Sequence, residues 1–84
     1  MMLTENDLII TKHAQEKMHI EGISVSQIIE ALERGSKYRQ TDGLLAVHSY
    51  YSVAYKIIGA KYLIKTVFTN GWKYEMLQMW KSRI

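Results

Sequence analysis

The residues of this chain that could do chemistry are histidines and a set of lysines and arginines spaced two apart. If residues 37–39, 44–50, 52–58 and 61–69 are strands, their side chains alternate between two faces. One face is then predicted to be apolar, with Tyr38, Leu45, Val47, Val53, Tyr55, Ile57, Tyr62, Ile64 and Phe68. The other is predicted to be cationic, with Lys37, Arg39, His48, Lys56, Lys61 and Lys65. Such a face either holds an anionic partner or keeps sheet edges from pairing with other copies.

This set of side chains is sufficient for cleavage of a phosphodiester without a metal. The reaction needs a base for the 2′-hydroxyl, positive charge at phosphorus and an acid for the leaving oxygen. Histidine supplies acid or base near neutral pH, and lysine or arginine supplies charge. We predict catalytic roles for His13, His48 and Lys65, and RNA contacts from the remaining cations, namely Lys37, Arg39, Lys56 and Lys61.

His13 raises a geometric conflict within this prediction. It belongs to the helical layer, whereas the cations face away from that layer unless the helix lies at the rim of the sheet. Thr66 is expected on the helix side, where it would form an alternative site with His13. A histidine bonded to a nearby carbonyl is the structural alternative. Base stacking is not predicted, because the tyrosines other than Tyr50 fall on the apolar face.

Two helices are predicted to precede the strands. Thr11 can cap a helix from Lys12 to about His19, and Gly22 supplies the left-handed residue that closes it. Ser24 and Gln27 form a capping box, which opens a second helix that ends at Gly35. Apolar residues of this second helix recur at helical spacing, at Val25, Ile28, Ile29 and Leu32.

Turn signals divide the strands, and the tail has a different pattern. Asp42-Gly43 and, more loosely, Gly59-Ala60 are typical of hairpin turns. The join near Tyr50-Tyr51 is either a tight turn or a bend, and this choice sets the facing of His48. Asn70-Gly71 favours a further hairpin, but the tail 72–84 has helical spacing of Trp72, Met76, Met79 and Trp80. We predict an α+β fold: two N-terminal helices on a twisted antiparallel sheet of three or four strands, with a C-terminal helix.

Composition limits the class of protein. The chain of 84 residues is expected to form a single domain, 1–84, and it contains no Cys and no Pro. Its three histidines lack chelating spacing, so we predict no metal and no cofactor. The net charge of +3 is uneven, at −2 up to Gly43 and +5 beyond it, which favours an anionic partner. No apolar run reaches the length of a membrane span and the N-terminus is acidic, so a cytoplasmic protein is expected.

The order of motifs up to about Thr69 resembles the DUF4258 family of small domains. The matching residues are Thr11-Lys12-His13-Ala14-Gln15-Glu16-Lys17-Met18, Gly22-Ile23-Ser24, Ile28–Gly35, Tyr55-Lys56 and Leu63–Phe68. Lys17 and Glu21 stand where that family usually has arginines, and Glu21 reverses the charge. The tail 72–84 lies outside the resemblance.

The resemblance implies a fold similar to RelE/ParE-type toxins and other small metal-independent ribonucleases. It marks His13 as a family residue. The expected function is an RNA-binding or RNA-cleaving toxin-type module that would need an acidic antitoxin-like partner. One alternative is a non-catalytic protein that dimerises through the region Trp72–Trp80. Another is a regulatory protein whose cationic sheet binds an acidic protein segment.

Overall fold

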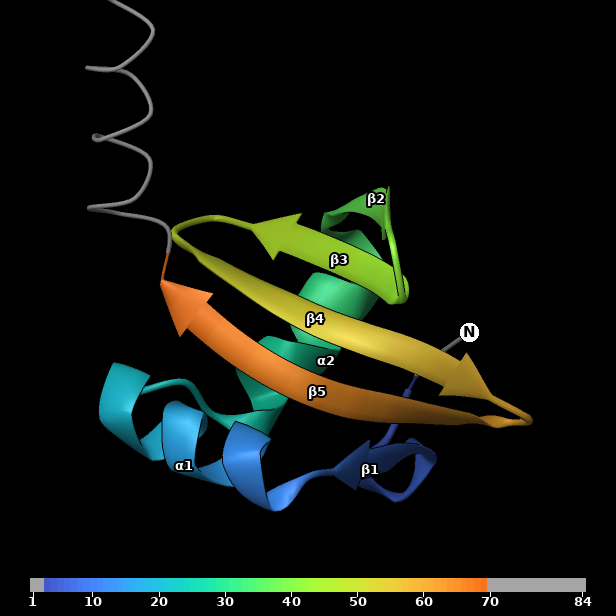
Figure 1. Ribbon diagram of the computed structural model, residues 1–84. Helices are drawn as coiled ribbons and strands as arrows, with labels where there is room; N and C mark the ends of the chain where they lie inside the picture. The colour runs from blue at the N-terminus through green and yellow to red at the C-terminus, as the bar shows by residue number, and fades with distance from the viewer. Residues whose placement is uncertain (1–2, 70–84) are drawn as a thin grey trace, which may run out of the picture.

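The fold is α+β, with two helices at the N-terminal end followed by four consecutive strands (Figure 1). The computed structural model describes residues 3–69. A 3-10 turn, Glu5–Asp7, leads into the other elements, which are β1 (Leu8–Ile10), α1 (Lys12–Glu21), α2 (Val25–Arg34), β2 (Ser36–Gln40), β3 (Gly43–His48), β4 (Tyr51–Ile58) and β5 (Lys61–Thr69). The predicted C-terminal helix in 72–84 lies outside the described residues.

Both helices begin and end where the sequence signals place them. The Thr11 hydroxyl accepts a hydrogen bond from the amide of Ala14, and Gly22 closes α1 with a φ of 69°. Ser24 and Gln27 make both bonds of the capping box. These caps satisfy amides and carbonyls that the helix itself leaves without partners. The predicted helix starts and the stop at Gly22 are therefore confirmed.

The sheet has five strands in the order β1-β5-β4-β3-β2, and β1 runs parallel to β5. The prediction of an antiparallel sheet of three or four strands is therefore wrong in two respects. Strand β1 has only three residues, Leu8–Ile10. That length is too short for an alternating pattern to distinguish a strand from the approach to a helix.

The helices cover the sheet unequally (Figure 1). Helix α2 lies against one face, whereas α1 runs beside β5, along the edge that the short β1 leaves uncovered. Among the described residues no helix covers the opposite face, which we call the open face. The core lies between α2, α1 and the covered face, and it includes Ala14, Ile23, Ile28, Ala31, Leu32, Ala46, Val53, Ile64 and Val67.

Polar contacts at both ends of α1 hold the helix to the edge of β5. At its start, the Thr11 hydroxyl caps the helix and also donates to the carbonyl of Ile64 at 3.0 Å. At its end, the Glu21 carboxylate accepts from the amide of Thr69 at 3.3 Å and lies 3.8 Å from Lys17 Nζ. Backbone groups of β5 that would otherwise form an exposed edge are thus bonded to α1. Glu21 makes this attachment, and Lys17 pairs with Glu21 within the helix; these are the two positions that depart from the motif pattern of the predicted resemblance.

A β-bulge in β5 and three two-residue turns decide which side chains share a face. Ala54 pairs with Thr66, yet Tyr55 pairs with Ile64, so Lys65 is an extra residue in β5. Paired residues share a face, and a two-residue turn pairs residues three apart, so odd and even positions exchange faces at every turn. The helix-covered face therefore carries Lys37, Arg39, Leu44, Ala46, His48, Tyr51, Val53, Tyr55, Ile57, Tyr62, Ile64 and Val67.

The prediction of one apolar and one cationic face is consequently wrong. The open face carries Tyr38, Leu45, Val47, Ser52, Ala54, Lys56, Lys61, Leu63, Thr66 and Phe68. Lys65 joins it at the bulge, because its side chain reaches the same carboxylate as Lys56. The join before Tyr51 is a tight turn at Ser49 and Tyr50, with Ser49 at a φ of 56°, and it places His48 on the helix side.

No helix in residues 3–69 is long and apolar enough to cross a membrane.

The turn between β2 and β3 depends on Gly43. Its φ is 116°, and a Cβ there would lie 2.5 Å from the carbonyl oxygen of Tyr55. We expect Gly43→Ala to lower the free energy of unfolding by about 2–4 kcal/mol, measured by urea denaturation. Gly59→Ala is the matched control, because Gly59 has a φ of 60° and nothing within 4 Å, and it should cost about 1 kcal/mol. Equal losses in the two variants would contradict the close approach at Gly43.

Candidate functional site

The bulge in β5 brings His13 to the open face. His13 lies in the first turn of α1, and its Nε2 is 3.1 Å from the Thr66 hydroxyl. Thr66 is paired with Ala54 and so faces the open side, directly after Lys65 in the chain. The helix lies at the rim of the sheet, which is the arrangement under which His13 and the cations could share one surface. Thr66 was expected on the helix side, and the bulge is the reason that this expectation fails.

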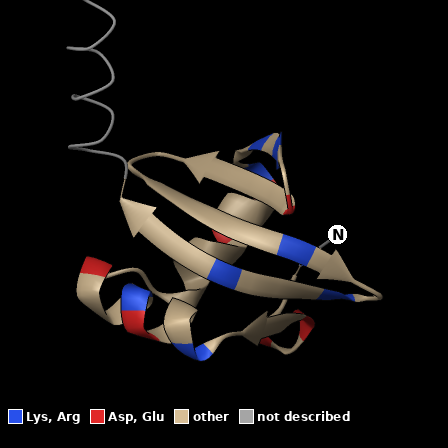
Figure 2. Ribbon diagram, viewed as in Figure 1, with Lys and Arg blue, Asp and Glu red and all other residues tan. Residues whose placement is uncertain are grey.

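Two lysines of the open face share one carboxylate. The Nζ of Lys56, on β4, lies 3.0 Å from Asp42 Oδ1, and the Nζ of Lys65, on β5, lies 3.5 Å from Asp42 Oδ2. Lys65 also donates to the backbone carbonyl of Asp42. Figure 2 shows the basic segments on the adjacent strands β4 and β5 and an acidic one at the turn between β2 and β3. Asp42 therefore holds the two ammonium groups close together.

The two lysines change the pKa of the Asp42 carboxyl group. The hydrogen bond from Lys56, followed by the charges of Lys56 and Lys65, lowers the pKa of Asp42 below its ordinary value of 3.8. The Asp42 side chain is 66% exposed, so water screens these interactions strongly. The cluster therefore carries one net positive charge at neutral pH and remains accessible.

Lys61, the third lysine of the open face, also has a partner within the chain. Its ammonium group donates to the backbone carbonyl of Asn6, in the turn that precedes β1. All three lysines of this face, Lys56, Lys61 and Lys65, thus have partners within the chain. A ligand phosphate would have to replace or share those partners.

Tyr38 is a candidate binding residue that the sequence reasoning placed on the wrong face. It is 56% exposed and paired with Leu45, which puts it on the open face. A row of paired residues runs across the sheet from Tyr38 through Leu45 and Ala54 to Thr66. With strands about 4.8 Å apart, the row spans roughly 14 Å and joins an aromatic ring to the His13 contact. The signal that would have found it is the parity change at Ser49-Tyr50, because the prediction grouped Tyr38 and Leu45 correctly but placed both with Val53.

His48 lies in a separate group on the covered side. Its Nε2 is 2.8 Å from Glu30 Oε1, on α2, and its ring meets the edge of Tyr51 at a centroid distance of 6.0 Å. The Tyr51 hydroxyl donates to the carbonyl of Gln27 at 2.7 Å, and burial, followed by the charge of Glu30, raises the pKa of that hydroxyl. This group fastens the β3–β4 turn to α2. The prediction that His48 joins the face of Lys56 and Lys65 is therefore wrong.

Lys37 and Arg39 also lie apart from the other cations. They are exposed on β2, the terminal strand, and they point to the same side as Ala46 and Leu44. Lys37 donates to the carbonyl of Gly35 at 2.7 Å. The structure thus divides the seven predicted site residues. It places Lys56 and Lys65 on one carboxylate of the open face and His13 beside Thr66 at the edge of that face, places Lys61 further along it, and leaves Lys37, Arg39 and His48 on the other side.

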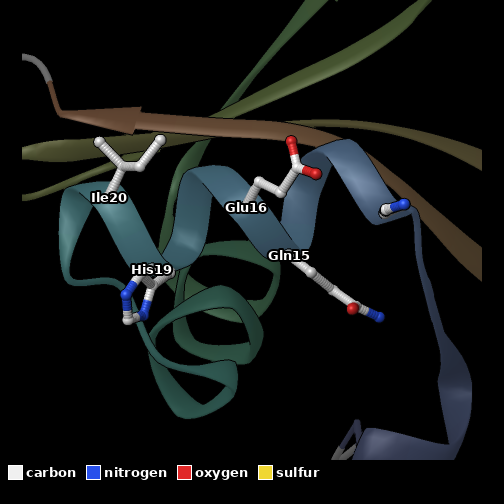
Figure 3. Close-up of a pocket in the computed structure, with 5 residues that line it drawn as sticks. Gln15, Glu16, His19 and Ile20 are labelled. Carbon is white, nitrogen blue, oxygen red and sulfur yellow. The ribbon is translucent and has the colours of Figure 1, made fainter.

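A shallow hollow lies on the outer surface of α1 (Figure 3). Its described lining comes from that one helix, namely Lys12, Gln15, Glu16, His19 and Ile20. Glu16 and Ile20 leave the helix on one side of the hollow, and Gln15 and His19 on the other. His13, Lys56 and Lys65 are not part of it. We therefore place the candidate site on the open face and not in this hollow.

Within residues 3–69, no three His, Asp or Glu side chains lie close enough together to hold a metal ion. The donors that gather on the open face are instead cations and one histidine, which are suited to an anion. No family model, curated protein or solved structure matches this chain. The resemblance to the DUF4258 family remains a prediction from the motifs.

The lowered pKa of Asp42 predicts a specific pH dependence. A depressed folded-state pKa stabilises the protein above the unfolded value, near 3.8, and this stabilisation is lost as pH falls through the folded-state pKa. We expect the difference in unfolding free energy between the wild type and Asp42→Asn to be constant from pH 7 to 5 and to shrink below pH 4. Urea denaturation at stepped pH values measures it. A difference that is unchanged at pH 2.5 would contradict the ion pairs with Lys56 and Lys65.

Proposed function

We propose that this protein binds single-stranded RNA across the open face of its sheet and cleaves it without a metal, as a toxin-type module. The observation that carries the proposal is the contact of His13 with Thr66, next to Lys65 at the bulge. It sets a histidine at the edge of the same face that carries the ammonium groups of Lys56 and Lys65. An acidic antitoxin-like protein is the partner we propose for the same basic surface.

The arrangement supports binding through two kinds of contact. Lys56 and Lys65 supply positive charge for phosphate groups, and Tyr38 supplies an exposed ring on which a base can stack. Binding of this type tolerates many sequences, because every nucleotide has a phosphate and a base.

The cleavage step follows from the same residues. His13 takes the proton of a ribose 2′-hydroxyl, and the 2′-oxygen then attacks phosphorus. Lys65 stabilises the negative charge that develops on the phosphate oxygens. The bond from phosphorus to the 5′-oxygen breaks, and a lysine ammonium, Lys56 or Lys65, donates the proton that the leaving oxygen takes up. The products are a 2′,3′-cyclic phosphate and a 5′-hydroxyl.

The binding part predicts a graded loss in variants of the open face. We expect Lys65→Ala and Lys56→Ala each to weaken binding of a labelled oligouridylate and to lower the slope of log K against log salt by about 0.7. Tyr38→Ala should weaken binding about 5- to 100-fold with little change in slope, because stacking on an aromatic ring contributes about 1–3 kcal/mol. Fluorescence anisotropy at several salt concentrations measures both quantities. Binding that is insensitive to salt and to all three changes would exclude this surface.

The cleavage part predicts separation of binding from catalysis. His13→Ala should reduce the rate of cleavage of a mixed RNA about 10²- to 10⁴-fold while RNA affinity stays within twofold. His19→Ala is the matched control, since His19 is exposed on the same helix but lies outside the candidate site. Expression in a bacterial host should arrest growth for the wild type and His19→Ala only. A wild type that is harmless and leaves RNA intact would remove the enzymatic part.

A second candidate function, non-catalytic binding of another protein, is favoured by one observation. Apart from its lysines, the open face carries partly exposed apolar side chains, including Leu45, Val47 and Leu63. Apolar surface of this kind is typical of protein interfaces. The predicted homodimer through Trp72–Trp80 lies outside the described residues. Absence of RNA affinity together with a concentration-dependent dimer would select this candidate.

A further inference from the structure

We infer that Asp42 is a built-in competitor of the ligand: its carboxylate occupies the place between Lys56 and Lys65 that a phosphate of the bound strand takes. This inference rests on the proposed function, and it concerns the regulation of that same site. It assigns the turn between β2 and β3 the role of an anionic plug that binding must displace.

The geometry of the contacts is that of an anion site with an occupant. Two ammonium groups from neighbouring strands approach separate oxygens of one carboxylate, at 3.0 Å for Lys56 and 3.5 Å for Lys65. A phosphodiester has two non-bridging oxygens that can make the same pair of contacts. The carboxylate comes from a different part of the sheet, the β2–β3 turn, and not from either lysine strand.

The plug is held weakly enough to leave. The Asp42 side chain is 66% exposed, and ion pairs between exposed groups are weak and screened by salt. Asp42 is the second residue of a two-residue turn, outside the paired residues Gln40 and Gly43. The backbone carbonyl of Asp42 keeps its own bond with Lys65, so the turn can stay in place while the carboxylate swings out.

Displacement has a consequence for affinity. In the free protein the Asp42 carboxylate neutralises half of the charge of the two lysines. In the complex, the bound phosphate lies close to the displaced carboxylate, and the two negative charges repel each other. Asp42 therefore lowers RNA affinity and also raises selectivity, because a ligand with a single weak charge does not compete. A strand that adds stacking on Tyr38 makes up for the lost ion pairs.

The test compares Asp42→Asn with Glu16→Gln, using a labelled oligouridylate and the full chain. Each variant removes one negative charge, but Glu16 lies in the hollow of α1, away from Lys56 and Lys65. We expect Asp42→Asn to bind about 3- to 10-fold more tightly than the wild type, with a salt slope steeper by about 0.7. Glu16→Gln should change affinity less than twofold. Introducing Lys56→Ala and Lys65→Ala into the Asp42→Asn variant should abolish the gain in RNA affinity.

The outcomes separate this inference from the proposed function. If Lys56→Ala and Lys65→Ala weaken RNA binding but Asp42→Asn equals the wild type, the surface binds RNA and the plug is excluded. If no variant binds RNA, the proposed function fails. Titration with inorganic pyrophosphate then tests whether Asp42 competes with an anion for Lys56 and Lys65. Lysine ammonium signals followed by NMR should then show tighter pyrophosphate binding in Asp42→Asn than in the wild type. Equal affinities in that titration would overturn the inference.

Discussion

One extra residue in β5 determines which side chains of this protein can act together. Without the bulge at Lys65, the residues after Ile64 would exchange faces, and Thr66 would lie on the covered side. Its hydroxyl would then be out of reach of a histidine at the rim of the open face. A β-bulge bends its strand and redirects a side chain, and such bulges are frequent beside functional sites. The union of helix and sheet residues at the candidate site follows from this local irregularity.

The two edges of the sheet have different partners, and α1 is one of the elements that bond to the β5 edge. Along β5, β1 pairs with the first part of the strand, and α1 bonds to the remainder through Thr11 and Glu21. At the other edge, β2 pairs only with β3 among the described strands. Lys37 and Arg39 on β2 oppose pairing with a second copy, because like charges would meet in several registers. The described cations of the sheet thus fall into two groups, one on the terminal strand β2 and one on the open face.

Apart from β1, the elements of the described chain could be predicted from the sequence because their signals are local. Thr11, Gly22 and the Ser24–Gln27 pair each act within one turn of backbone, and each bond is present in the structure. Strand ranges followed from alternation for the same reason. The faces could not be assigned in this way, because they depend on counting residues through every turn. The turn at Ser49 contains neither Gly nor Asn, and its length sets the side on which His48 lies.

Only part of the candidate site could be predicted from the sequence. Lys56 and Lys65 were named from their chemistry and His13 also from the family resemblance, but the bulge that sets the facing of Lys65 and Thr66 has no composition of its own, since Lys65-Thr66 is ordinary strand sequence. The pairing of Asp42 with two lysines joins three segments and is visible only in three dimensions. Tyr38 was excluded by the same parity error that misplaced His48. An error in assigning side chains to one face of a sheet carries over to every later strand, whereas an error in a helix cap affects only that helix end.

The contact between His13 and Thr66 joins residues 53 positions apart, at opposite ends of the described chain. Contacts of such high sequence separation require closure of a long loop, which is entropically costly and slow relative to helix formation. During synthesis, α1 and α2 leave the ribosome well before β5, so a nascent chain carries the histidine without its neighbours. The contact between His13 and Thr66 can therefore form only after β5 has been synthesised, and a product that stops before β5 lacks it.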